Sequence, residues 1–272
     1  MDGRDCRHRR RRFLDLLVRL ELGTGSRASK RGPGERYAGS ISALSKDFAW
    51  ARAEWLGDFL RGLGMDEKQR FHLADVERAV WKDPRGVVLV RGVVLVEGIS
   101  DQVALEALAE RRGRNLDAEG ISVVPIGGAQ AIGRFLEQLG PRGLDVRLAG
   151  LCDAAEEGDF RRGLERAGFG SDLTRADMEA LGFYVCVVDL EDELIRALGA
   201  ASVERVVAAQ RELGSFRTLQ KQPAWQGRTV EEQLRRFMGS GGKRKIRYAR
   251  LLVEALDLTR VPRPLDRVLA HV

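Results

Sequence analysis

Apolar and polar positions along the middle of the chain alternate between two patterns, one typical of buried strands and the other of amphipathic helices. Four short runs rich in Val, Ile and Leu predict strands, at residues 93–96, 121–126, 146–151 and 184–188. Amphipathic segments after these runs predict helices, at residues 101–112, 129–139, 159–167 and 191–198. Short apolar strands joined through helices pair in parallel by right-handed crossovers. The pattern therefore predicts an α/β domain over residues 86–199, with about four mainly parallel strands flanked by helices.

The segments before this domain follow different patterns. Residues 1–40 are basic and contain a stretch rich in Gly, Ser and charge, which predicts a partly disordered segment. Residues 41–85 place Trp, Phe and Leu at helical spacing, which predicts a helical region with these side chains in its core. The chain is therefore expected to have a helical extension before the α/β domain.

Residues 200–272, after the domain, return to a helical pattern. The main predicted helices lie at residues 202–213, 230–238 and 243–256. A proline-containing loop over residues 217–228 separates the first two, and Pro262 and Pro264 predict a final turn. The sequence thus predicts a second helical extension at the C-terminal side.

The composition of the 272 residues narrows the class of protein. Hydrophobic residues make up 44% and charged residues 32%, as in soluble globular proteins, and no apolar run approaches the ~20 residues that span a membrane. Charged residues interrupt the apolar part of the N-terminus, which argues against a signal peptide. Cys6, Cys152 and Cys186 cannot form a complete disulfide framework, so we expect a reducing, cytoplasmic location. The net charge of +6 favours an anionic partner.

Acidic side chains follow three of the four predicted strands. Glu97 and Asp101 come after the first strand, Asp153 after the third, and Asp189 and Glu191 after the fourth. Because parallel strands end at one edge of a sheet, these acids can converge there. Carboxylate oxygens are the ligands of hard cations, which predicts a site for Mg²⁺ or Mn²⁺. Any single acid could instead cap a helix, and it is the coincidence across three strands that favours a metal site.

Two further features are candidates for phosphate contact. Gly127 and Gly128 lie between the second strand and the next helix, where their amides could approach a phosphate or simply form a turn. The densest basic cluster after residue 40 consists of Lys243, Arg244, Lys245 and Arg247. This cluster either contacts phosphate or forms a solvated helix face. The sequence around it, GSGGKRK, lacks the spacing of an ATP-binding P-loop.

Three motifs occur in an order and spacing that resemble the TOPRIM domain, which topoisomerases, bacterial primases and OLD-family (overcoming lysogenization defect) nucleases share. They are VLVEGISD at residues 94–101, PIGGAQ at 125–130 and GLCDAAEE at 150–157. The spacing of Glu97 and Asp101, with the acidic DLEDEL after the last strand, looks most similar to the OLD branch. The resemblance covers residues 87–199 well and residues 200–272 moderately.

The resemblance implies a Rossmann-like TOPRIM sheet and two-metal cleavage of nucleic-acid phosphodiesters with Mg²⁺ or Mn²⁺. The metal ligands that it implies are Glu97, Asp101, Asp153, Asp189 and Glu191. It also implies that a lysine in a later helix, followed four residues on by alanine, assists catalysis. Lys245, with Ala249 in KIRYA, is the best match. Glu97 and Lys245 are accordingly the predicted catalytic residues.

The chain departs from the family pattern in two respects. The usual Asp-x-Asp after the third strand becomes Asp153 followed by two alanines, so Ala155 cannot bind metal and Glu156 or Glu157 could substitute. OLD proteins also carry an ATPase ahead of the TOPRIM domain, and residues 1–82 are too short for one and lack its motifs. The chain therefore resembles a stand-alone TOPRIM protein that works beside a separate ATPase.

The leading functional hypothesis is a metal-dependent nuclease that acts on DNA, with Lys243, Arg244 and Arg247 on the phosphate backbone. One alternative is a catalytically weak or inactive TOPRIM module that binds nucleic acid or a separate ATPase. A second alternative is a primase-like nucleotidyl transferase. No membrane partner is expected, and a homodimer is left open.

Overall fold

The computed structural model describes residues 91–143 and 145–272 of the chain. The predicted basic segment at residues 1–40 and the predicted helical region at residues 41–85 lie outside the described residues. Within the described ranges, no helix is long and apolar enough to cross a membrane.

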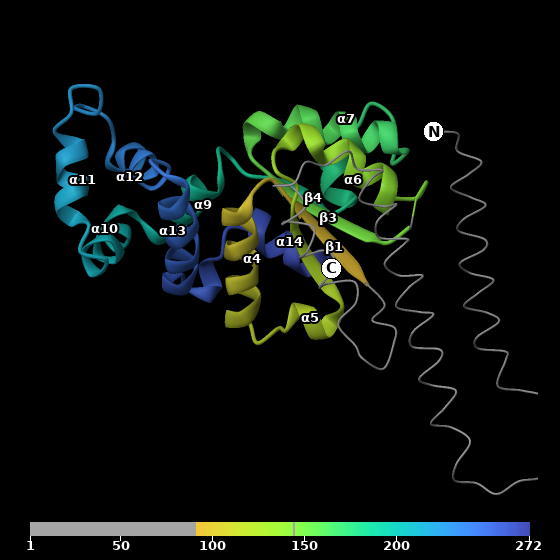
Figure 1. The fold of residues 1–272 in the computed structure, drawn as a ribbon, viewed down its shortest axis with the longest axis horizontal. Coiled ribbons are helices and arrows are strands. Elements are labelled where there is room, and N and C mark those ends of the chain that lie inside the picture. The colour runs from red at the N-terminus through yellow and green to blue at the C-terminus, as the bar shows by residue number, and fades with distance from the viewer. Residues whose placement is uncertain (1–90, 144) are drawn as a thin grey trace, which may run out of the picture. The chain divides into compact units, whose positions relative to one another are not determined.

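The centre of the fold is a sheet of four parallel strands (Figure 1). The strands are β1 (Gly92–Val96), β2 (Ile121–Pro125), β3 (Arg147–Cys152) and β4 (Phe183–Val185), in the order β2-β1-β3-β4. The predicted α/β class with a mainly parallel sheet is therefore confirmed. The chain adds β2 on one side of β1 and then β3 on the other, so the winding reverses between β1 and β3. Such a reversal opens a crevice at the carboxyl ends of the two strands.

Helices cover both faces of the sheet, because alternate residues of each strand face opposite sides. In β1, Val94 and Val96 belong to one core, and Val93 and Leu95 belong to another. The helices around the sheet are α4 (Ile99–Arg111), α5 (Leu116–Glu119), α6 (Ile132–Leu139), α7 (Glu157–Ala167), α8 (Arg175–Ala180) and α14 (Arg263–His271). Figure 1 shows α6 and α7 on one side of the sheet, with α4 and α14 on the other. Two short 3₁₀ turns precede α6 and α7, namely η1 (Ala129–Ala131) and η2 (Ala154–Glu156).

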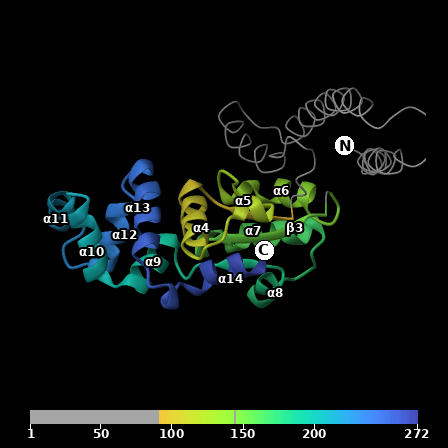
Figure 2. The ribbon, with the colours of Figure 1, turned by 90° about the horizontal axis from the view of Figure 1, so that it is seen from below.

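The C-terminal helices extend the core on the α4 side of the sheet. They are α9 (Leu190–Leu198), α10 (Ala200–Ala209), α11 (Leu213–Gln220), α12 (Val230–Met238) and α13 (Gly242–Ala255), with the 3₁₀ turn η3 (Leu258–Arg260) before α14. Helix α13 packs along α4, and both views show the two side by side (Figures 1 and 2). One continuous apolar core includes Leu105 of α4, Phe237 of α12 and Tyr248 of α13. This packing places α13 next to the carboxyl end of the sheet.

The structure corrects three local predictions. Strand β4 ends at Val185 rather than at residue 188, because the N–H of Val187 donates to Glu193 Oε1 at 2.7 Å instead of to a neighbouring strand. The predicted loop over residues 217–228 begins as helix, since α11 extends to Gln220. The predicted final turn is the helix α14, because Pro264 lies in its first turn, where proline is tolerated.

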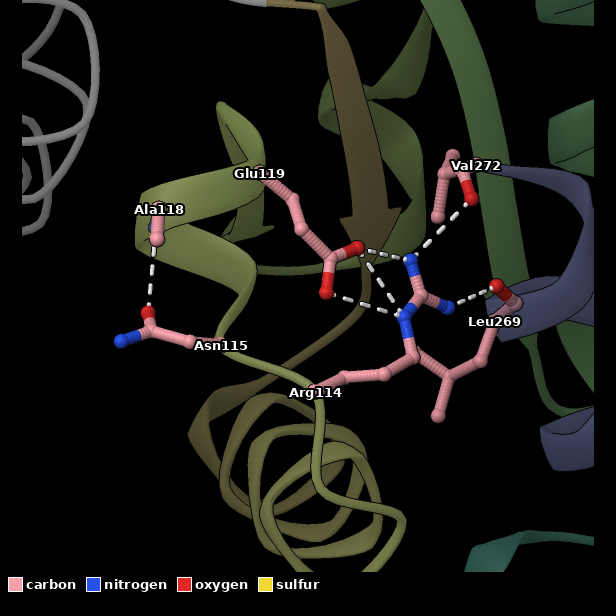
Figure 3. Close-up of polar contacts among 6 residues, drawn as sticks. All are labelled: Arg114, Asn115, Ala118, Glu119, Leu269 and Val272. Carbon is pink, nitrogen blue, oxygen red and sulfur yellow. Dashed lines mark hydrogen bonds and ion pairs between the residues drawn. The ribbon is translucent and has the colours of Figure 1, made fainter.

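The end of α14 is tied to α5 by the side chain of Arg114 (Figure 3). Its guanidinium donates to the backbone oxygens of Leu269 at 2.5 Å and Val272 at 3.2 Å, and pairs with Glu119 at 2.5 Å. In the same turn, Asn115 Oδ1 accepts the N–H of Ala118 at 3.0 Å and caps α5. These contacts fix the end of the last helix, which packs against β3 and β4.

Candidate metal centre

Three carboxylates meet where the winding of the sheet reverses. Glu97 directly follows β1, Asp153 directly follows β3, and Glu156 ends the turn η2. One ligand oxygen from each lies within 4.8 Å of the other two. The positions of Glu97 and Asp153 follow from the parallel pairing of β1 with β3, which brings Val96 level with Leu151 and so brings the two strand ends together. We call Glu97, Asp153 and Glu156 the acidic triad.

Some carboxylate oxygens of the acidic triad are buried without a hydrogen-bond partner among the described residues. They are Glu97 Oε2 and Glu156 Oε2. Burial, together with the negative charges of Glu156 and Asp101, raises the pKa of Glu97. Burial, together with the charges of Asp101, Asp189 and Glu97, raises the pKa of Asp153 to about 8. Unpaired, crowded carboxylates are costly, and a hard divalent cation such as Mg²⁺ fits this set of oxygen donors.

The backbone of Glu97 is fixed by the two glycines after β2. The amides of Gly127 and Gly128 both donate to the Glu97 carbonyl oxygen at 3.2 Å. The two residues adopt φ values of +75° and +115°, a region that glycine occupies without the strain of a side chain. The glycines therefore orient the first residue of the acidic triad. Their predicted contact with phosphate stays a prediction, and both amides are already engaged in the fold.

A second acidic group surrounds Lys245, which reaches the sheet edge from α13. Its Nζ lies 3.4 Å from Glu191 Oε2, and Glu191 is only 5% exposed. Burial raises the pKa of Glu191 to about 7 against the opposing charge of Lys245. Burial by itself would lower the pKa of Lys245, but the charges of Glu191, Asp101 and Asp153 raise it above its ordinary value. The lysine is thus held as an ammonium group between buried carboxylates.

Asp101 and Asp189, two of the predicted metal ligands, have structural contacts of their own. Asp101 Oδ2 accepts the N–H of Gly98 at 3.0 Å and so caps α4. Asp189 Oδ1 accepts the N–H of Asp192 at 2.8 Å, and its Oδ2 contacts Arg235 Nε at 2.5 Å. Their roles as ligands stay predictions. The structure brings Glu97 and Asp153 together in the acidic triad and places the other three predicted ligands beside it, next to Lys245 and Arg235.

Two residues of this region were not singled out from the sequence. Glu156 was named only as one of two substitutes for the residue at position 155, and its place in the acidic triad depends on the turn η2. Arg235 comes from α12, 46 residues after Asp189, and no local motif connects the two. Only the Asp-x-x-Glu spacing could have indicated Glu156, and nothing comparable indicates Arg235.

The predicted basic cluster lies at the start of α13. Arg244 Nη2 contacts Glu212 Oε1 at 3.0 Å, Arg247 pairs with the same carboxylate, and the hydroxyl of Tyr248 donates to Glu212 Oε2 at 2.8 Å. Lys243 is exposed. An open pocket here is lined by Glu212, Gly241, Gly242, Lys243, Arg244 and Arg247. A single carboxylate therefore balances only part of the positive charge around the pocket.

The raised pKa values predict an unusual pH dependence of stability without metal. Asp153, with a folded pKa of about 8 against an ordinary 3.8, keeps its proton in the folded state when the unfolded chain has lost it. Stability from this group is therefore complete below pH 4 and is lost as the pH rises through 8. Thermal unfolding in EDTA from pH 5 to 8.5 should show this decline, and Mn²⁺ should reverse it at the alkaline end. D153N should flatten the profile; an unchanged slope in D153N would contradict the assignment.

Comparison with known proteins agrees with this geometry. Residues 89–154 match the model of the TOPRIM domain of overcoming lysogenization defect (OLD) protein-like proteins. The structure is similar to the C-terminal region of the Xanthomonas campestris pv. campestris OLD protein. For the structure phased with iodine, the TM-score is 0.51 at 25% identity, over 68% of this chain and 95% of that one. For the structure phased with platinum, the values are 0.53 and 26%, over 67% and 91%. No curated protein sequence matches the chain significantly.

The parallel sheet, its reversal between β1 and β3 and the family match define a TOPRIM domain. Within that class, residues 89–154 match the OLD-like type, and the structure is similar to the C-terminal region of an OLD protein. The resemblance inferred from the three sequence motifs is thereby confirmed.

Proposed function

We propose that this protein is a metal-dependent nuclease that cleaves nucleic-acid phosphodiesters, with DNA as its substrate. The observation that carries the proposal is the acidic triad at the carboxyl ends of β1 and β3, with buried and unpartnered oxygens, beside the ammonium group of Lys245. The match to an OLD-like TOPRIM domain supports a nuclease-type module. Such modules use divalent cations, and the donor set here suits Mg²⁺ or Mn²⁺.

In this proposal each group at the sheet edge has a distinct role. Glu97 and Asp153 would hold Mg²⁺, and the bound ion would acidify a water molecule and stabilise negative charge on phosphate oxygens. Lys245, which pairs with Glu191, would neutralise charge that develops on the phosphate. A second ion would require Asp101, Asp189 and Glu191. Asp189 would have to exchange its contact with Arg235 for the ion, whereas Glu191 Oε1 is buried and has no hydrogen-bond partner among the described residues.

The charge of the C-terminal helices supports a nucleic-acid substrate. Residues 201–250 contain twelve Lys and Arg but only four Asp and Glu. This basic segment includes α13, which carries Lys245 at the candidate metal centre and Lys243, Arg244 and Arg247 around the neighbouring pocket. Basic side chains of this kind neutralise backbone phosphates without reading base sequence. A strand held along α13 would place one phosphodiester at the acidic triad.

One observation favours a second candidate, a TOPRIM module that binds nucleic acid or a separate ATPase without cutting. Asp189 has both oxygens engaged, one by a backbone amide and one by Arg235, and Ala155 offers no ligand. If these contacts persist when metal binds, the site holds one ion at most. The two candidates differ in whether the bound metal supports cleavage.

Metal removal is the direct test of the proposal. The full chain should nick or linearise plasmid DNA with Mg²⁺ or Mn²⁺, lose this activity in EDTA and regain it when metal is restored, because the carboxylates alone cannot activate water. Gel assays should also include linear duplex DNA, single-stranded DNA and RNA. Binding of Mn²⁺ without cleavage of any of these would support the non-cutting module. Cleavage that continues in EDTA would show that the metal is not required.

A further inference from the structure

The turn after β3 differs from the Asp-x-Asp pattern at the position where the pattern has its second aspartate. Ala155 occupies that position and cannot bind a cation. Glu156, one residue later, instead shares the acidic triad with Asp153 and Glu97. We propose that Asp-x-x-Glu, formed by Asp153 and Glu156 on a 3₁₀ turn, replaces Asp-x-Asp as the metal-binding element of this TOPRIM domain. The inference rests on the proposed function only in taking the metal to be the one used in cleavage.

The conformation of η2 explains why the ligand lies at position 156. The N–H of Glu156 donates to the carbonyl oxygen of Asp153 at 3.1 Å. This hydrogen bond joins residues i and i+3 and closes one turn of 3₁₀ helix. In a 3₁₀ turn the side chains at i and i+3 eclipse one another, so Glu156 lies over Asp153. The side chain at i+2 points about two-thirds of a turn away. Ala155 is accordingly exposed to solvent, whereas Asp153 and Glu156 are half-buried.

The turn is fixed by its neighbours rather than by its own sequence. The N–H of Ala154 donates to the carbonyl of Val188 at 3.0 Å, which ties η2 to the segment that follows β4. Glu157, the next residue after the turn, forms an ion pair with Arg175 and does not belong to the acidic triad. Of the two acids that could substitute for a residue at position 155, only Glu156 therefore faces Glu97 and Asp153.

The carboxylate of Glu156 lacks the partner that a buried carboxylate normally has, which indicates that it binds a cation. Its Oε2 is buried and has no hydrogen-bond partner in the described part of the chain, and the same holds for Glu97 Oε2. One oxygen of Glu156 lies within 4.8 Å of an oxygen of Glu97, so the two carboxylates repel each other when no cation lies between them. A carboxylate kept solely for stability would have a cationic or amide partner, as Glu157 has in Arg175. A divalent cation between Glu97, Asp153 and Glu156 supplies the missing partner to Glu97 Oε2 and Glu156 Oε2.

The test is Mn²⁺ binding to the full chain, measured by calorimetry without nucleic acid. E156Q should weaken Mn²⁺ binding roughly tenfold or more, because a charged ligand becomes a neutral amide. The matched control is E157Q, which makes the same chemical change one residue later and should leave the affinity within about twofold of the wild type. Circular dichroism and thermal unfolding should show both variants folded. Wild-type affinity in E156Q, or an equal loss in E157Q, would overturn the inference.

A second pair of variants tests the geometry of the turn. A155D should not restore Mn²⁺ binding when it is added to E156A, because the side chain at position 155 points to solvent. Recovery of affinity in the double variant would show that the turn does not exclude this position, and would overturn the proposed replacement of Asp-x-Asp.

The outcome is separable from that of the proposed nuclease activity. Mn²⁺ binding that depends on Glu156, without cleavage of any nucleic acid, would uphold the inference and contradict the nuclease proposal. Cleavage that E156Q leaves at the wild-type rate would uphold the nuclease proposal and contradict the inference.

Discussion

Replacing Glu97 by glutamine is expected to lower Mg²⁺-dependent cleavage of plasmid DNA by about a thousandfold, or roughly 4 kcal/mol of transition-state stabilisation. Glu97 belongs to the acidic triad, follows β1 directly and has an unpartnered buried oxygen. Glutamine keeps the size of the side chain but removes the charge that binds a cation. The initial rate of nicking in Mg²⁺, and the affinity for Mn²⁺ without nucleic acid, should fall together.

E97Q should keep the wild-type fold, so a loss of cleavage would report on the charge of the side chain. The Glu97 backbone is held by the amides of Gly127 and Gly128, and these contacts do not involve the side chain. Removing the charge also relieves repulsion from Glu156 and Asp101, so thermal stability in EDTA should be equal to or above that of the wild type. E137Q, on the exposed face of α6, is the matched control and should cleave normally. Cleavage by E97Q within about fivefold of the wild type would contradict the assignment of the site.

The positions of Glu97 and Asp153 could be predicted from the sequence because they follow from the topology alone. Glu97 and Asp153 directly follow strands that pair in parallel, so any such sheet with β1 beside β3 brings them together. The apolar runs at residues 93–96 and 146–151 were sufficient to identify those strands. Topology therefore predicts the strand-end residues of such a site before any side-chain geometry is known.

The residues that sequence patterns missed depend on local turns and on distant packing. Glu156 joins the acidic triad because η2 is a 3₁₀ turn, and the binary pattern of DAAEE does not distinguish that turn from the start of an α-helix. Asp189 pairs with Arg235 because α12 packs against α9, although the helices α10 and α11 separate the two along the chain. A prediction of metal ligands from the acidic residues after each strand cannot anticipate that a guanidinium group from another helix pairs with one of them.

These two findings have a common consequence for the chemistry. At the acidic triad, Glu97 Oε2 and Glu156 Oε2 are buried without a hydrogen-bond partner among the described residues, whereas Asp189 pairs with Arg235 and Glu191 with Lys245. Charge at the sheet edge is thus balanced on one side by protein cations and left unbalanced on the other. The unbalanced side is the one that a metal ion would occupy first.

Replacing Lys245 by methionine is expected to lower kcat about a hundredfold with little change in KM, because the ammonium group acts on charge that develops during cleavage. The same change should move the pH midpoint of Mn²⁺ binding upward. The charge of Lys245 lowers the pKa values of Asp101, Glu191 and Asp153, so without it these carboxylates keep their protons to higher pH. Steady-state cleavage kinetics and calorimetric titrations from pH 6 to 8.5 would measure the two effects.

Two further variants separate the charge of Lys245 from its position. Lys245→Arg keeps the positive charge and should restore the pH midpoint of Mn²⁺ binding, but its larger planar group should not restore kcat. Lys221→Met removes an exposed lysine just after α11 and should leave both properties unchanged. A fall in kcat of equal size in Lys221→Met would mean that net charge alone explains the effect. If Lys245→Met cleaves at the wild-type rate, the ammonium group only balances Glu191 and its neighbours, and the catalytic role proposed for it is wrong.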